Sequence, residues 1–108
     1  MRFLEDHEKI HLGSITLEVI YCPGHSPGSV CFYNAKEKIL WGGDALFRES
    51  IGRTDLPGGD YETLEHNIQD RLFTLPDETE VYPGHGLPTT IGYEKVNNPF
   101  VGKARLSI

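Results

Sequence analysis

The amino-acid sequence predicts an α/β fold in which a mainly antiparallel sheet is covered by at least one helix. Residues 15–21, 29–33 and 38–41 have the length, alternation and β-branched content of strands. Residues 61–72 carry apolar side chains at helical spacing instead. No segment resembles a linker, so we expect residues 1–108 to form a single domain.

The three predicted strands are expected to be adjacent and antiparallel. Pro23 and Gly24 end the first strand, and a polar turn of hairpin length, residues 34–37, separates the second from the third. Residues 42–60 are rich in glycine and show little periodicity. This pattern indicates a long surface loop of the kind that carries function.

The predicted helix begins after Asp60, a residue type that caps helix N-termini. Its apolar stripe consists of Tyr61, Leu64, Ile68 and Leu72. A short strand is expected at residues 80–83, ending in Pro83-Gly84. From there to residue 108 the chain is expected to be irregular, because proline and glycine recur along it.

The charge and cysteine content argue against some classes of partner and against a disulfide. The chain has 10 basic and 16 acidic side chains, a net charge of −6, and its positive residues do not cluster. We therefore expect neither a nucleic-acid nor a membrane partner. No charged-then-apolar leader follows Met1 and no apolar run is long enough to span a bilayer, which favours a soluble, cytoplasmic protein. Cys22 and Cys31 are then expected to be reduced thiols.

A metal-site pattern is the main functional signal. Pro-Gly-His occurs twice, each time after an apolar β-like run, so His25 and His85 are expected at the rim of the sheet. The segment Trp-Gly-Gly-Asp delivers Asp44 in the same way, and a buried carboxylate would need a cation or hydrogen-bond donors. Two histidines and a carboxylate bind Zn²⁺ or Fe²⁺. The alternative is that these are ordinary turns with exposed side chains.

A rival metal motif occurs near the N-terminus. Residues 7–11 fit the His-Glu-x-x-His pattern, which requires a helix to bring its two histidines together. Gly13 and a predicted strand follow directly, so we expect an extended segment and a chance match.

Other polar residues have simpler interpretations. Cys22 and His25 have a Cys-x-x-His spacing without a second pair, so a buried thiol is expected. His66 should lie on the solvated face of the helix. Arg53 is expected to pair with Asp55 and shape the loop, with contact to an anion as the alternative.

Four ordered segments resemble successive motifs of the metallo-β-lactamase superfamily. They read Cys-Pro-Gly-His-Ser-Pro-Gly-Ser (22–29), Trp-Gly-Gly-Asp-Ala-Leu-Phe (41–47), Gly-Arg-Thr-Asp-Leu-Pro-Gly (52–58) and Val-Tyr-Pro-Gly-His-Gly (81–86). Residues 89–94 and 98–100 are similar too, and the branch they resemble is that of glyoxalase II-like (hydroxyacylglutathione hydrolase-like) hydrolases. The resemblance implies half of an αββα sandwich, the C-terminal half, because the His-x-His-x-Asp-His string of the first half does not occur.

The resemblance also implies roles for the three candidate ligands. His25 would bind the first metal ion and His85 the second, while Asp44 would bridge them and is the candidate catalytic residue. In the intact family a pair of Zn or Fe ions activates water against the carbonyl of a thioester such as S-lactoylglutathione. Three ligands are only part of that set, so we expect weak or absent metal binding, and weak or no activity, from this chain alone.

Two alternatives to thioester hydrolysis stay open. A persulfide dioxygenase has the same fold, one iron, and similar Gly-Asp-Ala-Leu and Gly-Arg-Thr-Asp segments. The other alternative is a non-catalytic metal-binding or interaction module.

Half a sandwich leaves the inner face of its sheet uncovered. We therefore expect either a homodimer or a separate N-terminal half as partner. The residues expected on that face are Ile15, Leu17, Val19, Val30, Phe32, Ile39 and Trp41.

Overall fold

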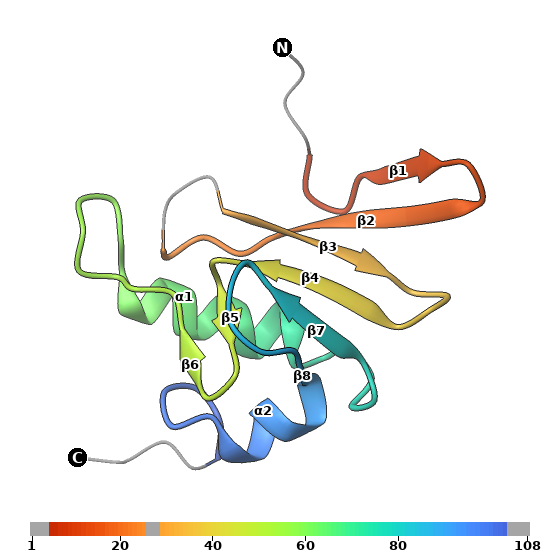
Figure 1. Ribbon diagram of the computed structural model, residues 1–108. Helices are drawn as coiled ribbons and strands as arrows, with labels where there is room; N and C mark the ends of the chain where they lie inside the picture. The colour runs from red at the N-terminus through yellow and green to blue at the C-terminus, as the bar shows by residue number, and fades with distance from the viewer. Residues whose placement is uncertain (1–4, 26–28, 104–108) are drawn as a thin grey trace.

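The computed structural model describes residues 5–25 and 29–103. Residues 26–28 belong to the first family-like motif and lie outside the described residues, as does Met1. Within them the strand order of the main sheet is β1-β2-β3-β4-β7-β8, with a second, small β5-β6 sheet beside it (Figure 1). The mixed, mainly antiparallel sheet with its helices confirms the predicted fold class.

The elements have the following bounds. The strands are β1 (Lys9–Leu12), β2 (Ile15–Tyr21), β3 (Val30–Asn34), β4 (Ile39–Gly43), β5 (Leu46–Phe47), β6 (Ser50–Ile51), β7 (Glu80–Pro83) and β8 (Thr89–Thr90). The helices are α1 (Tyr61–Asn67), the π-helical turn η1 (Ile68–Leu72) that continues it, and α2 (Ile91–Asn97).

The strand predictions are confirmed with small shifts. β2 and β7 match the predicted ranges, β3 lies one residue later than predicted, and β4 starts one residue late and runs on to Gly43. β1, β2, β3 and β4 pair antiparallel in sequence order, whereas β4 and β7 are parallel.

One side of the sheet is covered by α1 and η1, as the helical periodicity predicts. Leu64, Ile68 and Leu72 are fully buried and belong to one apolar cluster with Leu40 and Val81 of the sheet. Asp60 occupies the N-cap position of α1, but its carboxylate accepts a hydrogen bond from the Thr63 hydroxyl rather than from a backbone amide.

Two predictions about irregular segments were wrong in part, although residues 52–60 and 84–88 are irregular as expected. The expected loop at residues 42–60 contains the end of β4 and the β5–β6 hairpin, whose two-residue strands are too short to produce a period. The expected irregular tail contains β8 and α2. The hydroxyl of Thr90 caps α2 by accepting a hydrogen bond from the Tyr93 amide (3.1 Å), although Gly92, a poor helix former, lies in the first turn.

A fully buried carboxylate holds α2 against the β5–β6 hairpin. Glu94 accepts hydrogen bonds from the Thr89 hydroxyl (2.6 Å), the Asn98 side-chain amide (2.8 Å) and the backbone amide of Glu49 (2.9 Å). Asn98 also donates to the Ser50 carbonyl (3.1 Å). Because a buried charge is tolerated when its oxygens are hydrogen-bonded, this network fixes the position of the hairpin.

The cysteines and the N-terminal histidine motif follow the expectations. Cys22 and Cys31 are free and buried, and a hydrogen bond with Cys22 together with burial raises the pKa of the Cys31 thiol well above its usual range. Residues 7–11 are not helical, because β1 starts at Lys9, so the His-Glu-x-x-His geometry does not form. No helix in the described part of the chain is long and apolar enough to cross a membrane.

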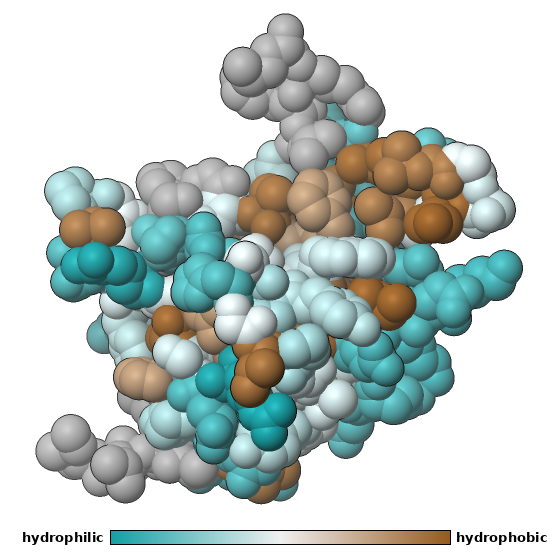
Figure 2. Space-filling view, viewed as in Figure 1, coloured by the Kyte–Doolittle hydropathy of each residue, from teal (hydrophilic) through white to brown (hydrophobic). Residues whose placement is uncertain are grey.

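The other side of the sheet carries an apolar row. Val19, Phe32, Trp41 and Tyr82 are paired in register across β2, β3, β4 and β7 and so lie on one face. None of them belongs to the cluster under the helices, and Trp41 and Tyr82 are 40% and 39% exposed. Figure 2 shows further apolar side chains gathered over β1 and β2. We call this side of the sheet the open face.

The residues predicted for an uncovered face lie on the open face by strand alternation. These residues are Ile15, Leu17, Val19, Val30, Phe32, Ile39 and Trp41. Their exposure differs: Ile15 is 46% exposed, whereas Val19 is fully buried.

The open face predicts dye binding or self-association of this chain. An exposed apolar patch of this kind binds a hydrophobic dye such as ANS unless another surface covers it. We expect Trp41→Glu to lower dye binding or self-association, measured by fluorescence and sedimentation. Leu56→Glu, at a residue of the loop before α1 that is 48% exposed, is the matched control and should change neither. A compact monomer that excludes the dye at micromolar concentration would contradict the prediction.

Candidate metal centre

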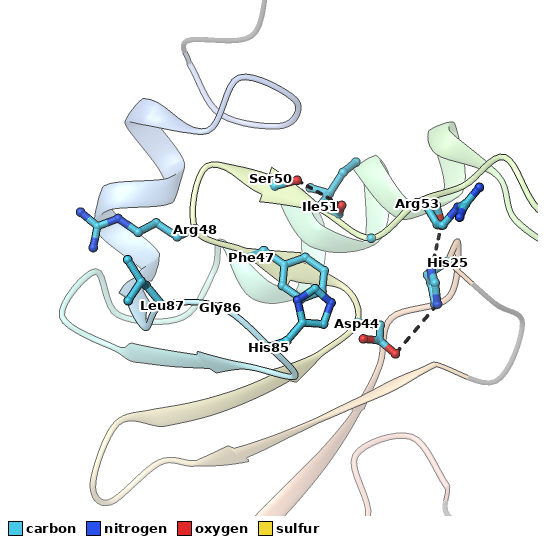
Figure 3. Close-up of a pocket in the computed structure, with 11 residues that line it drawn as sticks. His25, Asp44, Phe47, Arg48, Ser50, Ile51, Arg53, His85, Gly86 and Leu87 are labelled. Carbon is cyan, nitrogen blue, oxygen red and sulfur yellow. Dashed lines mark hydrogen bonds and ion pairs between the residues drawn. The ribbon is translucent and has the colours of Figure 1, made fainter.

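Three turns, each following a strand, line one pocket of about 360 Å³. His25 follows β2, Asp44 follows β4 and His85 follows β7. β2 and β4 both pair antiparallel with β3, and β7 is parallel to β4, so all three strands run in one direction and end at the same edge. The structure therefore brings the three sequence-predicted residues together in one pocket (Figure 3).

The ends of β4 and β7 are joined closely by glycines. The Gly84 amide donates to the Gly43 carbonyl (2.8 Å), and Gly43 has a φ of +53° beside an irregularity in the β4–β7 pairing. A Cβ at Gly84 would lie 3.1 Å from the Gly43 carbonyl oxygen and 3.2 Å from Oδ1 of Asp44. Glycine at this position lets Asp44 and His85 emerge side by side.

His25 is positioned by α1 and by the segment after β6. Gly24 has a φ of +136°, and a Cβ there would lie 2.3 Å from Cβ of Leu64. Nδ1 of His25 lies 2.9 Å from the Arg53 carbonyl oxygen. Because a carbonyl only accepts, Nδ1 carries the proton of the neutral ring and Nε2 keeps its lone pair. Nε2 lies 3.9 Å from Oδ2 of Asp44.

Asp44 and His85 complete the centre. The Asp44 side chain is 57% exposed, because it lies in the turn after β4 that lines the pocket, so the cost of a buried carboxylate does not arise here. Asp44 accepts no hydrogen bond from any residue that the structure describes. The ring of His85 stacks on Phe47, with centroids 4.5 Å apart and planes 26° from parallel. The stacking restrains an otherwise exposed ring.

The pocket walls include residues that the sequence did not single out. Phe47, Arg48, Ile51 and Leu87 line it, and only Phe47 lies within a family-like motif. Phe47, Arg48 and Ile51 belong to the β5–β6 hairpin, which was not predicted, and Leu87 lies between β7 and β8.

The predicted ion pair in this region is confirmed. Nε and Nη2 of Arg53 donate to the two carboxylate oxygens of Asp55 (2.8 and 3.0 Å). These hydrogen bonds lower the pKa of Asp55 and raise that of Arg53. The pair therefore holds the segment whose carbonyl orients His25.

The donor set fits part of a metal centre. Two imidazoles and a carboxylate are donor types for Zn²⁺ and Fe²⁺, and a backbone partner on Nδ1 is a common support of a ligating histidine. In the described ranges, however, no three His, Cys, Asp or Glu side chains converge closely enough to hold one ion. Cys22 lies in the core and His66 is exposed on α1, and neither lines the pocket.

Comparison with known proteins identifies the class. The family model of the metallo-β-lactamase superfamily matches residues 2–85, and the chain belongs to this superfamily.

Individual relatives carry different names. Hydroxyacylglutathione hydrolase GloC of Haemophilus influenzae is 43% identical over 99 residues, which make up 92% of this chain and 47% of GloC. The crystal structure of BLEG-1 B3 metallo-β-lactamase has a TM-score of 0.86 and 48% identity, covering 91% of this chain and 47% of BLEG-1. TTHA1623 in a di-iron-bound form has a TM-score of 0.81 and 46% identity, covering 92% and 48%. The chain spans about half the length of these relatives.

The close approach of Gly52 to the centre predicts an effect of substitution. A Cβ at Gly52 would lie 1.9 Å from the Asp44 carbonyl oxygen and 3.1 Å from Cβ of His25. We expect Gly52→Ala to destabilise the fold by about 2 kcal/mol or more in urea unfolding and to shift the NMR signals of the His25 ring. The control is Gly13→Ala, which has no atom within 4 Å but a φ of +62°. It should cost about 1 kcal/mol and leave those signals in place. Equal effects of the two variants would contradict the prediction.

Proposed function

We propose that this chain contributes His25, Asp44 and His85 to the metal centre of a hydrolase that cleaves thioesters of the hydroxyacylglutathione type. The main observation behind this proposal is that three donor side chains follow strands that run in the same direction and line one pocket. Nε2 of His25 is free to coordinate a metal ion, because the hydrogen bond to the backbone uses Nδ1. Similarity to GloC of Haemophilus influenzae supports the substrate class. The di-iron-bound relative TTHA1623 supports Fe as well as Zn as the metal.

Each residue has a physical task in this proposal. Bound Zn²⁺ or Fe²⁺ would act as a Lewis acid toward water and the thioester carbonyl. His25 and His85 would hold the two metal positions, and Asp44, which lies between them in Figure 3, would bridge these positions. Apolar side chains of Phe47 and Ile51 exclude bulk water from one wall of the pocket. A thiolate leaves without protonation, so no general acid is required from this chain.

The open face fits the incomplete donor set. Three ligands are too few for two tightly bound ions, and the chain spans about half the length of its relatives. We propose that the open face packs against a polypeptide equivalent to the remainder of those relatives, which would supply the other ligands. A second copy of this chain on the same face is the alternative outcome.

This proposal predicts weak metal retention by the chain alone. After loading with Zn²⁺ or Fe²⁺ and dialysis against metal-free buffer, we expect far less than one metal ion per chain, because each position has only one histidine and a shared carboxylate. Metal analysis of the dialysed protein makes the measurement. Near-stoichiometric, tightly held metal without a partner would contradict this expectation.

The function is tested by complementation. The metal-loaded chain is mixed with the separately expressed portion of Haemophilus influenzae GloC that this chain does not match, and hydrolysis of S-lactoylglutathione is followed. We expect activity only from the mixture, reduced by about 10²-fold or more in His25→Ala, Asp44→Ala or His85→Ala. His66→Ala, at an exposed position outside the pocket, is the matched control. Activity that survives Asp44→Ala would refute the assigned role, and an inactive mixture would favour a non-catalytic module.

A second candidate is a persulfide dioxygenase. Two histidines and one carboxylate are the donor set of mononuclear non-haem iron oxygenases, and His25, Asp44 and His85 supply these donor types in one pocket, although among the described residues they do not converge on a single position. In the same iron-loaded mixture, oxygen uptake with glutathione persulfide in place of thioester hydrolysis would favour this candidate.

A further inference from the structure

We propose that Arg48 and Glu80 form a subsite for the zwitterionic amino-acid end of a peptide thiol, next to the metal centre. This inference rests on the proposed thioester hydrolysis, because the amino-acid end belongs to the thiol that leaves when the thioester is cleaved. Arg48 would bind the carboxylate of that end, and Glu80 its ammonium group.

The position of Arg48 between two pockets is the first support. Arg48 lies in the turn between β5 and β6 and lines the metal-centre pocket. It also lines a second pocket of about 320 Å³, together with Glu80, Pro88, Thr89, Thr90 and Tyr93. The two pockets therefore share Arg48, whose guanidinium group points away from His25 and Asp44 in Figure 3.

The second support is that Arg48 stacks on an aromatic ring but has no ion-pair partner among the described residues. Its guanidinium carbon lies 5.3 Å from the centroid of the Tyr93 ring, so the aromatic face holds the group while its N–H edge stays available. Arg53 and Arg71 each pair with an aspartate, but no carboxylate of a described residue lies within ion-pair distance of Arg48. In a chain of net charge −6, this unpaired guanidinium is available to an anionic ligand.

Glu80 supplies the opposite charge in the second pocket. Its Oε2 accepts a hydrogen bond from the Tyr82 hydroxyl (2.9 Å), which orients the carboxylate on β7. A positive and a negative group in one pocket match a ligand that carries both an α-ammonium and an α-carboxylate. A thiol carrier that ends in phosphates would meet repulsion from Glu80.

The order of residues along the pocket gives the orientation of the substrate. In Figure 3 His25 and Asp44 lie at one end, Phe47 and His85 in the middle, and Arg48 and Leu87 at the other end. An acyl group beside Asp44 therefore places the sulfur near Phe47 and directs the rest of the thiol toward Arg48 and the second pocket.

Binding to the metal-free chain tests the subsite. The probes are S-methylglutathione, which has the amino-acid end, and S-methyl-N-acetylcysteamine, which lacks it, with affinities measured by NMR titration. We expect the wild-type chain to prefer S-methylglutathione by about tenfold. Arg48→Ala should remove the preference, Arg48→Lys should keep part of it, and Glu80→Gln should reduce it. Lys36→Ala, which removes a positive charge from the exposed β3–β4 turn, is the matched control and should leave the preference unchanged.

Several results would overturn the proposal. These are equal affinities for the two probes in the wild-type chain, a preference that survives Arg48→Ala, or tighter binding of S-methyl-coenzyme A than of S-methylglutathione. The outcome is separable from that of the complementation assay. Arg48-dependent binding without hydrolysis would support the subsite and contradict the proposed reaction. Hydrolysis without Arg48-dependent binding would support the reaction and contradict the subsite.

Discussion

The parallel pairing of β4 with β7, closed by the hydrogen bond from the Gly84 amide to the Gly43 carbonyl, is the constraint on which the candidate centre depends. It brings residues some forty positions apart in the sequence to the same edge of the sheet, Asp44 from one strand end and His85 from the next. The approach is so close that a side chain at Gly84 would contact Asp44. Without this pairing, the turns that carry Asp44 and His85 would have no common pocket.

A buried polar network controls the other wall of the pocket. Glu94 binds the backbone of Glu49, and Asn98 binds the carbonyl of Ser50, so α2 holds the hairpin that carries Phe47 and Arg48. Burying the Glu94 carboxylate completely is unfavourable for the free energy of folding, and the hydrogen bonds that it accepts offset this cost. The pocket therefore depends on the C-terminal helix as well as on the sheet.

Membership of the metallo-β-lactamase superfamily and the open face both agree with a chain that holds part of a metal centre. Among the described residues, helices cover one side of the sheet only, and the donors that line its pocket are fewer than a two-metal centre needs. Relatives with similar folds are named for different activities, as a hydroxyacylglutathione hydrolase and as a β-lactamase. Function resides in the side chains of a site rather than in the fold, so a subsite of the kind proposed for Arg48 and Glu80 is where relatives of one fold would differ in substrate.

The sequence alone determined the elements whose signal is local. β2 and the stripe on α1 and η1 follow from apolar periodicity, and the Pro-Gly turns identified His25 and His85 because they mark strand ends. Only the tertiary structure decided the β5–β6 hairpin, α2 and the place of Arg48 over Tyr93. Each of these is stabilised by contacts between distant residues, such as Glu49 with Glu94, 45 positions apart, and such contacts leave no periodic trace in the chain.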